Sequence, residues 1–405
     1  MKNIELVSPA GDIEKLRFAY HYGADAVYLS DNHYGMRKRA PNFSDSELHQ
    51  AVSYAHSINK KVYAAVNIFL RNNEMSDIKK YLHFLHEVSV DAIIVSDPGI
   101  LHLIKEEKLE FNIHLSTLAN VTNWASAQFW TDCGIKRIIL ARELSLQEIE
   151  EIRKKVACEL EVFVHGAMCV SYSGRCLISN YLSDRNANKG DCSQPCRWKY
   201  SVMEEKRPGL ILPVEEDENG TRIFSAKDLS MVRYIKELCD IGVDAFKIEG
   251  RMKSIYYLGN VTRIYKKAMQ SYKEGHFTKE LINEFENELD KIPHRGYSTG
   301  FYFGTPDSSA QLYEKDHDDG NHLFMGVVTE VKNDSVFIKL KNTLRVDDSI
   351  EFLNPHIGSD HNEKILEMKN KEDFPITQAN YNEIVSVKIQ GKAYPNEIIR
   401  KKSRK

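Results

Sequence analysis

The chain has 405 residues, enough for two or three domains with a large buried core. Hydrophobic residues make up 42% of it and charged residues 28%, an ordinary globular profile, and the net charge is −3. No apolar run is long enough to span a bilayer, and the N-terminus leads into an expected strand rather than a signal peptide. The composition excludes an integral membrane protein, and we expect a cytoplasmic protein with no membrane partner.

Roughly the first 300 residues repeat one unit, a short apolar strand followed by a loop and an amphipathic helix. Expected helices include Ile13–Tyr22, Asp45–Ile58, Met75–His86 and Leu146–Lys154, and the serines before the second and fourth are expected N-caps. The expected strands are Ile4–Val7, Ala26–Leu29, Val62–Val66, Ala92–Val95, Asn112–Leu115, Arg137–Leu140, Leu160–Val164 and Ala245–Ile248.

Eight strands that alternate with helices predict a parallel sheet closed into a (β/α)8-type, TIM-like barrel, so the fold class is α/β. A doubly wound open sheet is the alternative, but no glycine-rich dinucleotide fingerprint follows the first strand. In a barrel the active site lies at the carboxyl ends of the strands. Around this mouth we expect Pro9, Asn67, Asp97, His114, Ser116, Arg142, His165 and Glu249.

The barrel domain is predicted over residues 1–305, with an insertion at about 177–244 that has a hairpin tip at Asn219-Gly220. Residues 306–321 are a polar, acidic linker. From residue 322 to 405 the hydrophobic period becomes two, in Phe324–Val331, Ser335–Leu340, Leu344–Phe352 and Ile384–Ile389. This pattern predicts a small C-terminal antiparallel β-barrel domain. Five of the last six residues are cationic, which suggests either an RNA-binding tail or a solvated one.

Four of the seven cysteines are gathered in one segment, with six, fifteen and three residues between successive thiols. In a cysteine-poor cytosolic chain, such a group is more often a set of metal ligands than a pair of disulfides. The other three cysteines, Cys133, Cys158 and Cys239, are expected as small core residues. The gathered four are Cys169, Cys176, Cys192 and Cys196.

The open spacing of these cysteines favours an iron–sulfur cluster over zinc. Structural zinc sites usually pair their cysteines in two close knuckles, whereas the first pair here has six residues between its members. Such spacing suits a loop around a larger object, since each thiolate of a cluster needs to reach only one corner. Zinc and a set of free buried thiols remain the alternatives.

Six segments spread over nearly the whole chain form a recognisable set: SPAGDIEKLRFAYHYGADAVYLS, HGAMCVSYSGRCLISNYLSDRN, GDCSQPCRWKY, SAKDLS, KIEGRMKSIYY and HRGYSTGFYFG. Together they resemble the collagenase-like peptidases of family U32, whose peptidase label came without an assigned catalytic mechanism. The combination of GDCSQPCRW and KIEGRMKS is most similar to the branch of prephenate-dependent tRNA uridine hydroxylases.

The resemblance implies a tRNA-modifying enzyme that makes 5-hydroxyuridine at the wobble position of the anticodon loop, with prephenate as co-substrate. It also implies a [4Fe-4S] cluster, because relatives that hydroxylate ubiquinone precursors without oxygen hold one on four cysteines. Three of those cysteines match Cys169, Cys176 and Cys192. The fourth lies downstream in one relative, where this chain reads IFSAK, so Cys196 is the expected fourth ligand and Cys239 the alternative.

Prephenate is a dicarboxylate, and its binding calls for cationic side chains near the cluster. The candidates are Arg251, Lys247, Arg175 and Lys227, with an ordinary salt bridge as the competing interpretation of each. At the barrel mouth, His165, Glu249 and Asn67 are expected as catalytic groups that bind substrate or handle protons.

Three aromatic residues near the expected mouth, Tyr172, Tyr181 and Trp198, could stack on a target base. Burial in the protein interior is the more common role of such residues, and it is the competing interpretation.

Two other functions remain open. A cysteine peptidase would need a thiolate with a positioned histidine, and His165 lies four residues before Cys169. One nucleophile does not explain three further cysteines, and the sequence has no HExxH motif for a zinc peptidase. The third function is a non-catalytic RNA-binding protein whose metal only fixes the insertion. A homo-oligomer or a paralogue partner is also left open.

Overall fold

The computed structural model describes residues 3–31, 34–35, 42–169, 171–198, 226–306, 310, 320–332, 335–355 and 360–403. The chain divides into two compact units. The first holds residues 1–20, 24–253 and 295–318, and the second holds residues 21–23, 254–294 and 319–405. The second unit thus combines the C-terminal strands with a helical segment that precedes them in the sequence.

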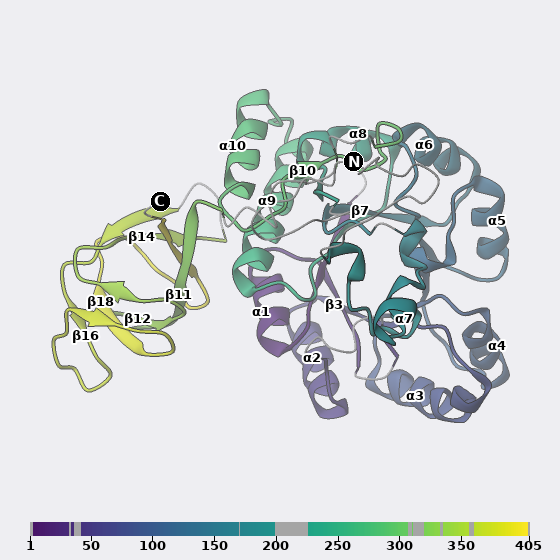
Figure 1. The fold of residues 1–405 in the computed structure, drawn as a ribbon, viewed down its shortest axis with the longest axis horizontal. Coiled ribbons are helices and arrows are strands. Elements are labelled where there is room, and N and C mark those ends of the chain that lie inside the picture. Colours follow the sequence, from purple (N-terminus) through teal and green to yellow (C-terminus); the bar gives the residue numbers. More distant parts are fainter. Residues whose placement is uncertain are drawn as a thin grey trace, which may run out of the picture. The chain divides into compact units, whose positions relative to one another are not determined.

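Eight parallel strands close into a barrel in the first unit (Figure 1). They are β1 (Glu5–Pro9), β2 (Ala26–Leu29), β3 (Lys61–Val66), β4 (Ala92–Val95), β5 (Ile113–Leu115), β6 (Arg137–Ile139), β7 (Glu159–Gly166) and β9 (Ala245–Ile248). Strands β1 to β7 pair in chain order, and β9 pairs with both β7 and β1, which closes the ring. The predicted TIM-like barrel is confirmed, and its β-branched, apolar strands form the buried core.

Helices on the outside of the barrel connect these strands (Figure 1). They are α1 (Ile13–His21), α2 (Asp45–Ser57), α3 (Met75–Val88), α4 (Pro98–Glu106), α5 (Trp124–Asp132), α6 (Leu146–Lys155) and α8 (Ile235–Ile241). The predicted N-caps Ser44 and Ser145 are confirmed, and each forms a capping box with a glutamate three residues later. In the described part of the chain, no helix combines the length and the apolar character needed to cross a membrane.

Two very short strands extend the sheet beyond β7. Strand β8 (Asp228–Ser230) runs antiparallel to the end of β7, and β10 (Tyr297–Ser298) pairs parallel with β8. Sequence reasoning missed both, because two or three residues are too few to show a hydrophobic period.

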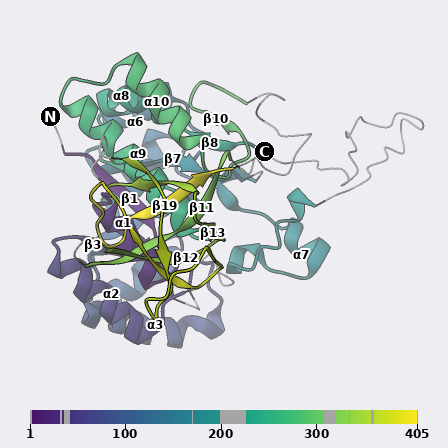
Figure 2. The same cartoon turned by 90° about the vertical axis from the view of Figure 1, so that its left-hand side faces the viewer.

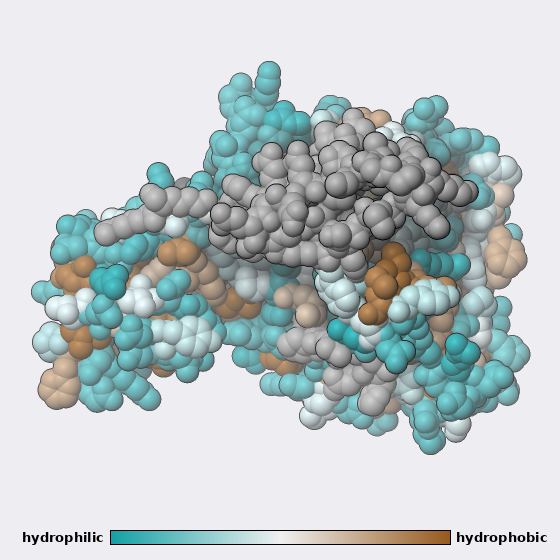
Figure 3. Space-filling model, in the orientation of Figure 1, coloured by the Kyte–Doolittle hydropathy of each residue, from teal (hydrophilic) through white to brown (hydrophobic). Residues whose placement is uncertain are grey.

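The cysteine segment between β7 and β8 consists of short turns around one small helix, α7 (Ile178–Ser183). The turns are η3 (Tyr172–Gly174), η4 (Ala187–Lys189) and η5 (Pro195–Arg197). Helix α7 projects from one side of the barrel (Figure 2). Hydrophobic side chains are exposed over α7 (Figure 3). The predicted hairpin tip at Asn219-Gly220, like most of the predicted linker, lies outside the described residues.

The second unit contains an antiparallel sheet with the strand order β15-β14-β19-β11-β12-β18-β16. Its strands are β11 (His322–Lys332), β12 (Ser335–Leu340), β14 (Ser349–Leu353), β15 (His361–Lys364), β16 (Met368–Lys369), β18 (Ile384–Lys388) and β19 (Ile398–Lys402). A pair of shorter strands, β13 (Leu344–Arg345) and β17 (Gln378–Ala379), pairs separately. The predicted antiparallel β-domain is confirmed as a half-barrel, although the run Leu344–Phe352 is interrupted at Asp347, which has a positive φ of 71°.

The predicted cationic tail is partly a buried strand. Arg400, on β19, is fully buried, and its Nε donates to Glu351 at 2.6 Å. Arg400 Nη2 donates to Glu288 at 2.8 Å, at the end of α10 (Lys279–Leu289). Lys401 forms an ion pair with Asp348. These two cations are therefore neutralised inside the second unit, which also includes α9 (Ile255–Lys273).

Candidate functional site

A cavity of about 170 Å³ opens at the carboxyl ends of the barrel strands. Its floor is made by inward-facing residues of the strands, among them Tyr28, Ala65, Ile94, Ile139 and Phe163. Its wall is the cysteine segment, because all four gathered cysteines line it. The structure therefore brings the cysteines to the mouth at which the barrel fold predicts an active site.

Lys247 on β9 carries a buried positive charge to the floor of this cavity. Its Nζ donates to Glu161 at 2.6 Å and lies 4.3 Å from the centroid of the Tyr28 ring. Burial lowers the pKa of Lys247 below its usual value, and the Glu161 carboxylate opposes that fall. The Lys247 ammonium therefore lies in an apolar environment, where the Glu161 carboxylate compensates its charge.

Glu161 belongs to a chain of ion pairs inside the barrel. On its other side it accepts from Arg137 Nη1 at 3.2 Å, and the same nitrogen donates to Glu5 at 2.7 Å. Burial raises the pKa of Glu161, but Lys247 and Arg137 more than offset this and keep it below its usual value. Barrel interiors are usually filled by branched apolar side chains, and buried ions carry a large desolvation cost. This costly arrangement makes the interior beneath the cavity a candidate functional site.

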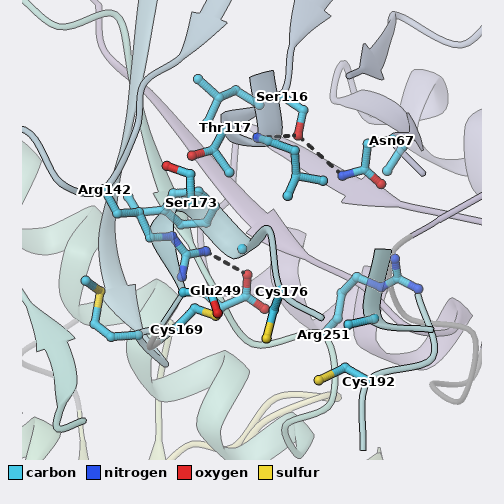
Figure 4. Close-up of a pocket in the computed structure, with 18 of the residues that line it drawn as sticks. Asn67, Ser116, Thr117, Arg142, Cys169, Ser173, Cys176, Cys192, Glu249 and Arg251 are labelled. Atoms are coloured by element: carbon cyan, nitrogen blue, oxygen red, sulfur yellow. Dashed lines mark hydrogen bonds and ion pairs between the residues drawn. The ribbon is translucent and has the colours of Figure 1, made fainter. Parts of the chain in front are cut away.

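Arg142 follows β6 and lines the cavity beside the cysteines (Figure 4). Its guanidinium carbon lies 3.8 Å from the centroid of the Phe163 ring, and Nη1 donates to the Ala167 carbonyl at 2.8 Å. Nη2 donates to Glu249 at 3.2 Å. Among the described residues, the buried Nε has no hydrogen-bond partner. A rigid guanidinium with a spare donor is suited to a carboxylate ligand.

Arg251 supplies a third cation to the cavity lining. Its Nη2 donates to the side-chain oxygen of Asn42, and its carbonyl accepts from Lys15 Nζ at 3.3 Å. A β-carbon added at Gly35 would lie 3.4 Å from Arg251 Nη1, an ordinary contact, but only 2.2 Å from Ser30 Oγ, so the glycine makes room for Ser30.

The predicted residues Glu249 and Asn67 also line the cavity. Asn67 Nδ2 donates to Ser116 Oγ at 3.5 Å, which makes a polar edge opposite the Arg142–Glu249 pair (Figure 4). Gly166, at the end of β7, has a φ of 111°, and a β-carbon there would lie 2.3 Å from the carbonyl oxygen of Glu249. Only glycine permits this close approach of β7 and β9 at the cavity.

Backbone donors point at two of the cysteine sulfurs. Cys176 Sγ accepts from the N–H of Ile178 at 3.4 Å, and Cys192 Sγ accepts from the N–H of Gln194 at 3.3 Å. In iron–sulfur proteins, hydrogen bonds to the ligating sulfurs tune the reduction potential of the cluster.

Glu143 fixes the loop that carries the first two cysteines. Its carboxylate accepts from the backbone N–H of Ser173 at 2.5 Å and from the Ser173 hydroxyl at 2.6 Å. Ser173 has a φ of 44°, a left-handed conformation that costs a non-glycine residue energy. The double hydrogen bond stabilises this conformation between Cys169 and Cys176.

The four cysteines are compatible with the expected iron–sulfur cluster, because all of them line one cavity. Over the residues the structure describes, no three His, Cys, Asp or Glu side chains are close enough together to hold a single ion. The four thiols instead line one cavity, as is needed when each sulfur binds a different corner of a larger group. Cys239 lies on α8, does not line this cavity, and has a pKa raised to about 12, mainly by burial. The position of Cys196 on the cavity wall favours it over Cys239 as the expected fourth ligand.

Three predicted site residues lie elsewhere. His165 is buried, and its ring centroid lies 5.4 Å from that of Tyr297 rather than on the cavity wall. A bulge between Phe163 and His165 shifts the register of β7 against β9, so His165 pairs with Ile248 and turns away from the barrel interior.

The other two residues that do not line the cavity are Arg175 and Lys227. Arg175 Nε donates to the Leu118 carbonyl at 2.8 Å, and the guanidinium packs over Phe69. Lys227 extends past Gly296, and the adjacent Asp228 is paired instead with Arg295 at 2.6 Å.

Of the eight side chains expected around the mouth, Asn67, Ser116, Arg142 and Glu249 line the cavity, and His165, Pro9, Asp97 and His114 do not. Asp97 caps α4 through the N–H of Gly99. His114 lines a different cavity. Lys61, Arg137 and Glu159, the first residues of β3, β6 and β7, line that cavity as well. The expectation for His114 was wrong because this residue lies inside β5, where its ring faces the barrel interior and packs against Tyr63 toward the amino ends of the strands, not at the mouth.

Sequence reasoning missed the roles of Glu143, Glu161 and Asn42. Glu161 had a detectable signal, since it is an acidic residue within the apolar run Leu160–Val164. Glu143 and Asn42 had none, because each acts on a residue far away in the sequence.

The fold and the cavity define an α/β protein with a closed (β/α)8 barrel whose mouth is lined by cysteines and cationic side chains. The chain belongs to peptidase family U32. Residues 11–312 match the family itself, and residues 320–400 match its C-terminal domain.

Three relatives illustrate the family. The chain is 36% identical over 403 residues to "tRNA hydroxylation protein P1" of Bacillus subtilis, covering 99% of this chain and 95% of that protein. It is 32% identical over 356 residues to "23S rRNA 5-hydroxycytidine C2501 synthase" of Escherichia coli, covering 86% of this chain and 52% of that protein. It is 31% identical over 316 residues to "Collagenase" of Porphyromonas gingivalis, covering 75% and 74%.

Proposed function

We propose that this protein is a cytoplasmic RNA-modifying enzyme that hydroxylates the wobble uridine of tRNA to 5-hydroxyuridine. In this proposal prephenate is the co-substrate, and Cys169, Cys176, Cys192 and Cys196 hold a [4Fe-4S] cluster. The observation that carries it is the single cavity that gathers these four cysteines with three cationic side chains. The names of relatives that span most or all of this chain, which describe tRNA and rRNA hydroxylation, support RNA as the substrate.

Hydroxylation of a uracil ring requires electron transfer, which a cluster held by the four cysteines would supply. The side chains of the protein would bind and orient the two substrates. A dicarboxylate in the cavity would meet Arg142 and Arg251, and the ammonium of Lys247 would compensate its charge from the floor. Glu249 keeps Arg142 in place through the 3.2 Å ion pair until the ligand arrives.

The target base is expected on the polar edge opposite these cations. Asn67 and Ser116 present an amide and a hydroxyl there, and both can hydrogen-bond to the edge of a uracil. A wobble uridine already lies in a loop, so its removal from the stack costs little free energy. The apolar floor under Tyr28 and Ile94 excludes water from the reacting groups.

The direct test combines the purified protein, prephenate and unmodified tRNA under anaerobic conditions, followed by nucleoside analysis by mass spectrometry. Formation of 5-hydroxyuridine supports the proposal. Unchanged tRNA together with cleavage of casein or collagen would establish a peptidase instead. Against that alternative, His165 is turned away from the cavity that Cys169 lines, so the two do not form a nucleophile–base pair.

The Arg251→Ala variant tests the carboxylate site separately. It should keep its iron, because Arg251 carries no sulfur ligand, and it should modify tRNA about 10- to 100-fold more slowly, since a charge-assisted hydrogen bond is lost. Arg251→Lys should recover only part of the rate, because an ammonium lacks the planar fork. Arg17→Ala is the matched control, since Arg17 is exposed on α1 and packs over Tyr54 away from the cavity.

A further inference from the structure

The rim of the cavity carries a ridge of exposed apolar side chains. Between residues 171 and 178, the cavity is lined by Ser171, Ser173, Gly174, Cys176 and Ile178, while other side chains of this stretch are exposed to solvent. These include Tyr172, which is 55% exposed, and Leu177, which is 54% exposed. Apolar side chains beside a reaction cavity are exposed at a cost, which a binding partner would offset.

Helix α7 and the turn after it extend this ridge. Tyr181 lies four residues after Leu177, one helical turn further along the same face, and it is 82% exposed. Turn η5 packs against α7 and ends at Trp198, which is 41% exposed, next to the cavity-lining Cys196. The sequence favoured burial of these three aromatic residues, and the structure exposes all of them.

The ridge is held rigidly from beneath. Glu143 fixes the turn at Tyr172 through its two hydrogen bonds to Ser173. A chain of hydroxyls ties α7 to the Cys192 loop, in which Ser193 N donates to Ser179 Oγ at 3.0 Å and the Ser183 and Ser193 oxygens are 2.6 Å apart. A surface ordered in advance loses little entropy when a ligand binds.

The ridge combines exposed aromatic rings with an exposed cation. Residues 169–198 contain four cationic residues and two acidic ones, and ion pairs join Arg185 to Asp191 and Lys189 to Glu74. Arg175 is exposed directly beside Tyr172 and Leu177. Aromatic faces interleaved with cations are typical of surfaces that bind single-stranded nucleic acid, where bases stack and phosphates pair with arginine.

We infer that this ridge is a stacking platform for the unpaired nucleotides that flank the target base. The inference rests on the proposed RNA substrate and assigns its neighbouring bases to Tyr172, Tyr181 and Trp198. A base drawn into the cavity must leave its 5′ and 3′ neighbours on the rim, and these three rings are the aromatic side chains exposed there in the described part of the cysteine segment.

The test measures binding of an unmodified anticodon stem-loop RNA to the full-length protein, with 2-aminopurine placed next to the target uridine. Tyr181→Ala and Tyr172→Ala should each weaken binding roughly 5- to 100-fold and reduce the fluorescence quenching that stacking causes. Iron content and the salt dependence of binding should not change, because no cysteine and no phosphate contact is removed. Tyr181→Phe should bind normally, since it keeps the ring.

Phe129→Ala is the matched control, because Phe129 is 59% exposed on α5, outside the cysteine segment. If the wild-type protein binds and modifies the RNA but the Tyr172→Ala/Tyr181→Ala variant does so equally well, the platform is disproved and the proposed function stands. If the wild type neither binds nor modifies RNA, both the stacking platform and the proposed function are disproved. A changed oligomeric mass of the double variant with unchanged RNA affinity would make the ridge a protein interface and overturn the inference.

Discussion

Lys247 shows at the scale of one residue how this barrel keeps a charge beside an apolar cavity. The ammonium loses its water on burial, and the Glu161 carboxylate at 2.6 Å compensates. Arg137 then compensates the second oxygen of Glu161. Removal of any one member leaves a buried charge without its counter-ion, which costs far more than removal of a neutral pair.

We expect Glu161→Gln to lower the free energy of unfolding by about 3–5 kcal/mol, because Lys247 and Arg137 would face each other without a carboxylate between them. The Glu161→Gln/Lys247→Met double variant should regain part of this loss, since the pair is removed together. Urea denaturation of the three proteins measures both effects. If the single variant were as stable as the wild type, this chain of ion pairs would contribute nothing to the free energy of unfolding.

Gly166 is the second residue-scale determinant, because β7 and β9 meet there at the cavity. Gly166→Ala should destabilise the protein and reduce activity, as its β-carbon would lie 2.3 Å from the Glu249 carbonyl. Gly134→Ala is the control, since Gly134 has a similar φ of 97° but no atom within 4 Å of the added carbon. The two melting temperatures separate the steric clash from backbone strain alone. Equal losses would contradict the proposed close contact.

The position of a site residue could be predicted only where the local hydrophobic pattern of the sequence marks the end of a strand. Asn67 and Glu249 follow apolar strands directly, so their positions at the mouth were readable from the sequence. His165 directly follows the expected strand Leu160–Val164, but it lies inside the longer β7, and the bulge before it, which has no sequence signal, reverses its direction. The pairing of Arg142 with Glu249 joins residues 107 positions apart, and such contacts have no local signature.

At the scale of elements, the second unit joins α9, α10 and the C-terminal sheet through one cluster of ions. Glu288 on α10 accepts from Arg400 on β19 at 2.8 Å and from Arg263 on α9 at 3.3 Å. Arg263 also donates to Asp360 at 2.6 Å. The period-two strands were predictable, whereas this cluster was not, and the terminal cations were interpreted as a tail because their buried partners lie far away in the sequence.

The pKa of Glu288 gives this cluster a defined pH dependence. Burial raises that pKa, but Arg400, Lys291 and Arg263 outweigh it and bring it from 4.5 to about 2. A lowered pKa in the folded state means that the stabilisation is complete above pH 4.5 and is lost as the pH falls toward 2.

We therefore expect Glu288→Gln to be less stable than wild type by up to about 3 kcal/mol at pH 6.5, with a smaller difference at pH 3. Calorimetric melting of both proteins across this range measures it. Glu284→Gln is the control, because Glu284 is exposed on the same helix and its contact to Lys267 is 3.9 Å long. A difference that is constant with pH would contradict the role of the ionised carboxylate.

At the scale of the whole molecule, the sequence predicted the barrel correctly because each strand–helix unit has its own hydrophobic period. It did not predict that the contact-based second unit contains residues 254–294 as well as the C-terminal strands. Removal of residues from 321 onward should therefore give an insoluble or partly unfolded protein, because Glu288 and Arg263 lose their partners. Soluble yield and circular dichroism test this, and a folded, stable truncated protein would contradict it.

The cofactor prediction also concerns the whole molecule, because the four cysteines lie in one cavity but come from separate turns of the chain. Anaerobically purified protein should be brown and contain about four iron and four sulfide per chain. Substitution of Cys169, Cys176 or Cys192 by alanine should remove the iron. Cys196→Ala should do the same, while Cys239→Ala, the matched control, should keep it, since Cys239 does not line this cavity. Iron retained by Cys196→Ala and lost by Cys239→Ala would reverse this assignment, and a colourless protein with one tightly bound zinc would exclude the cluster.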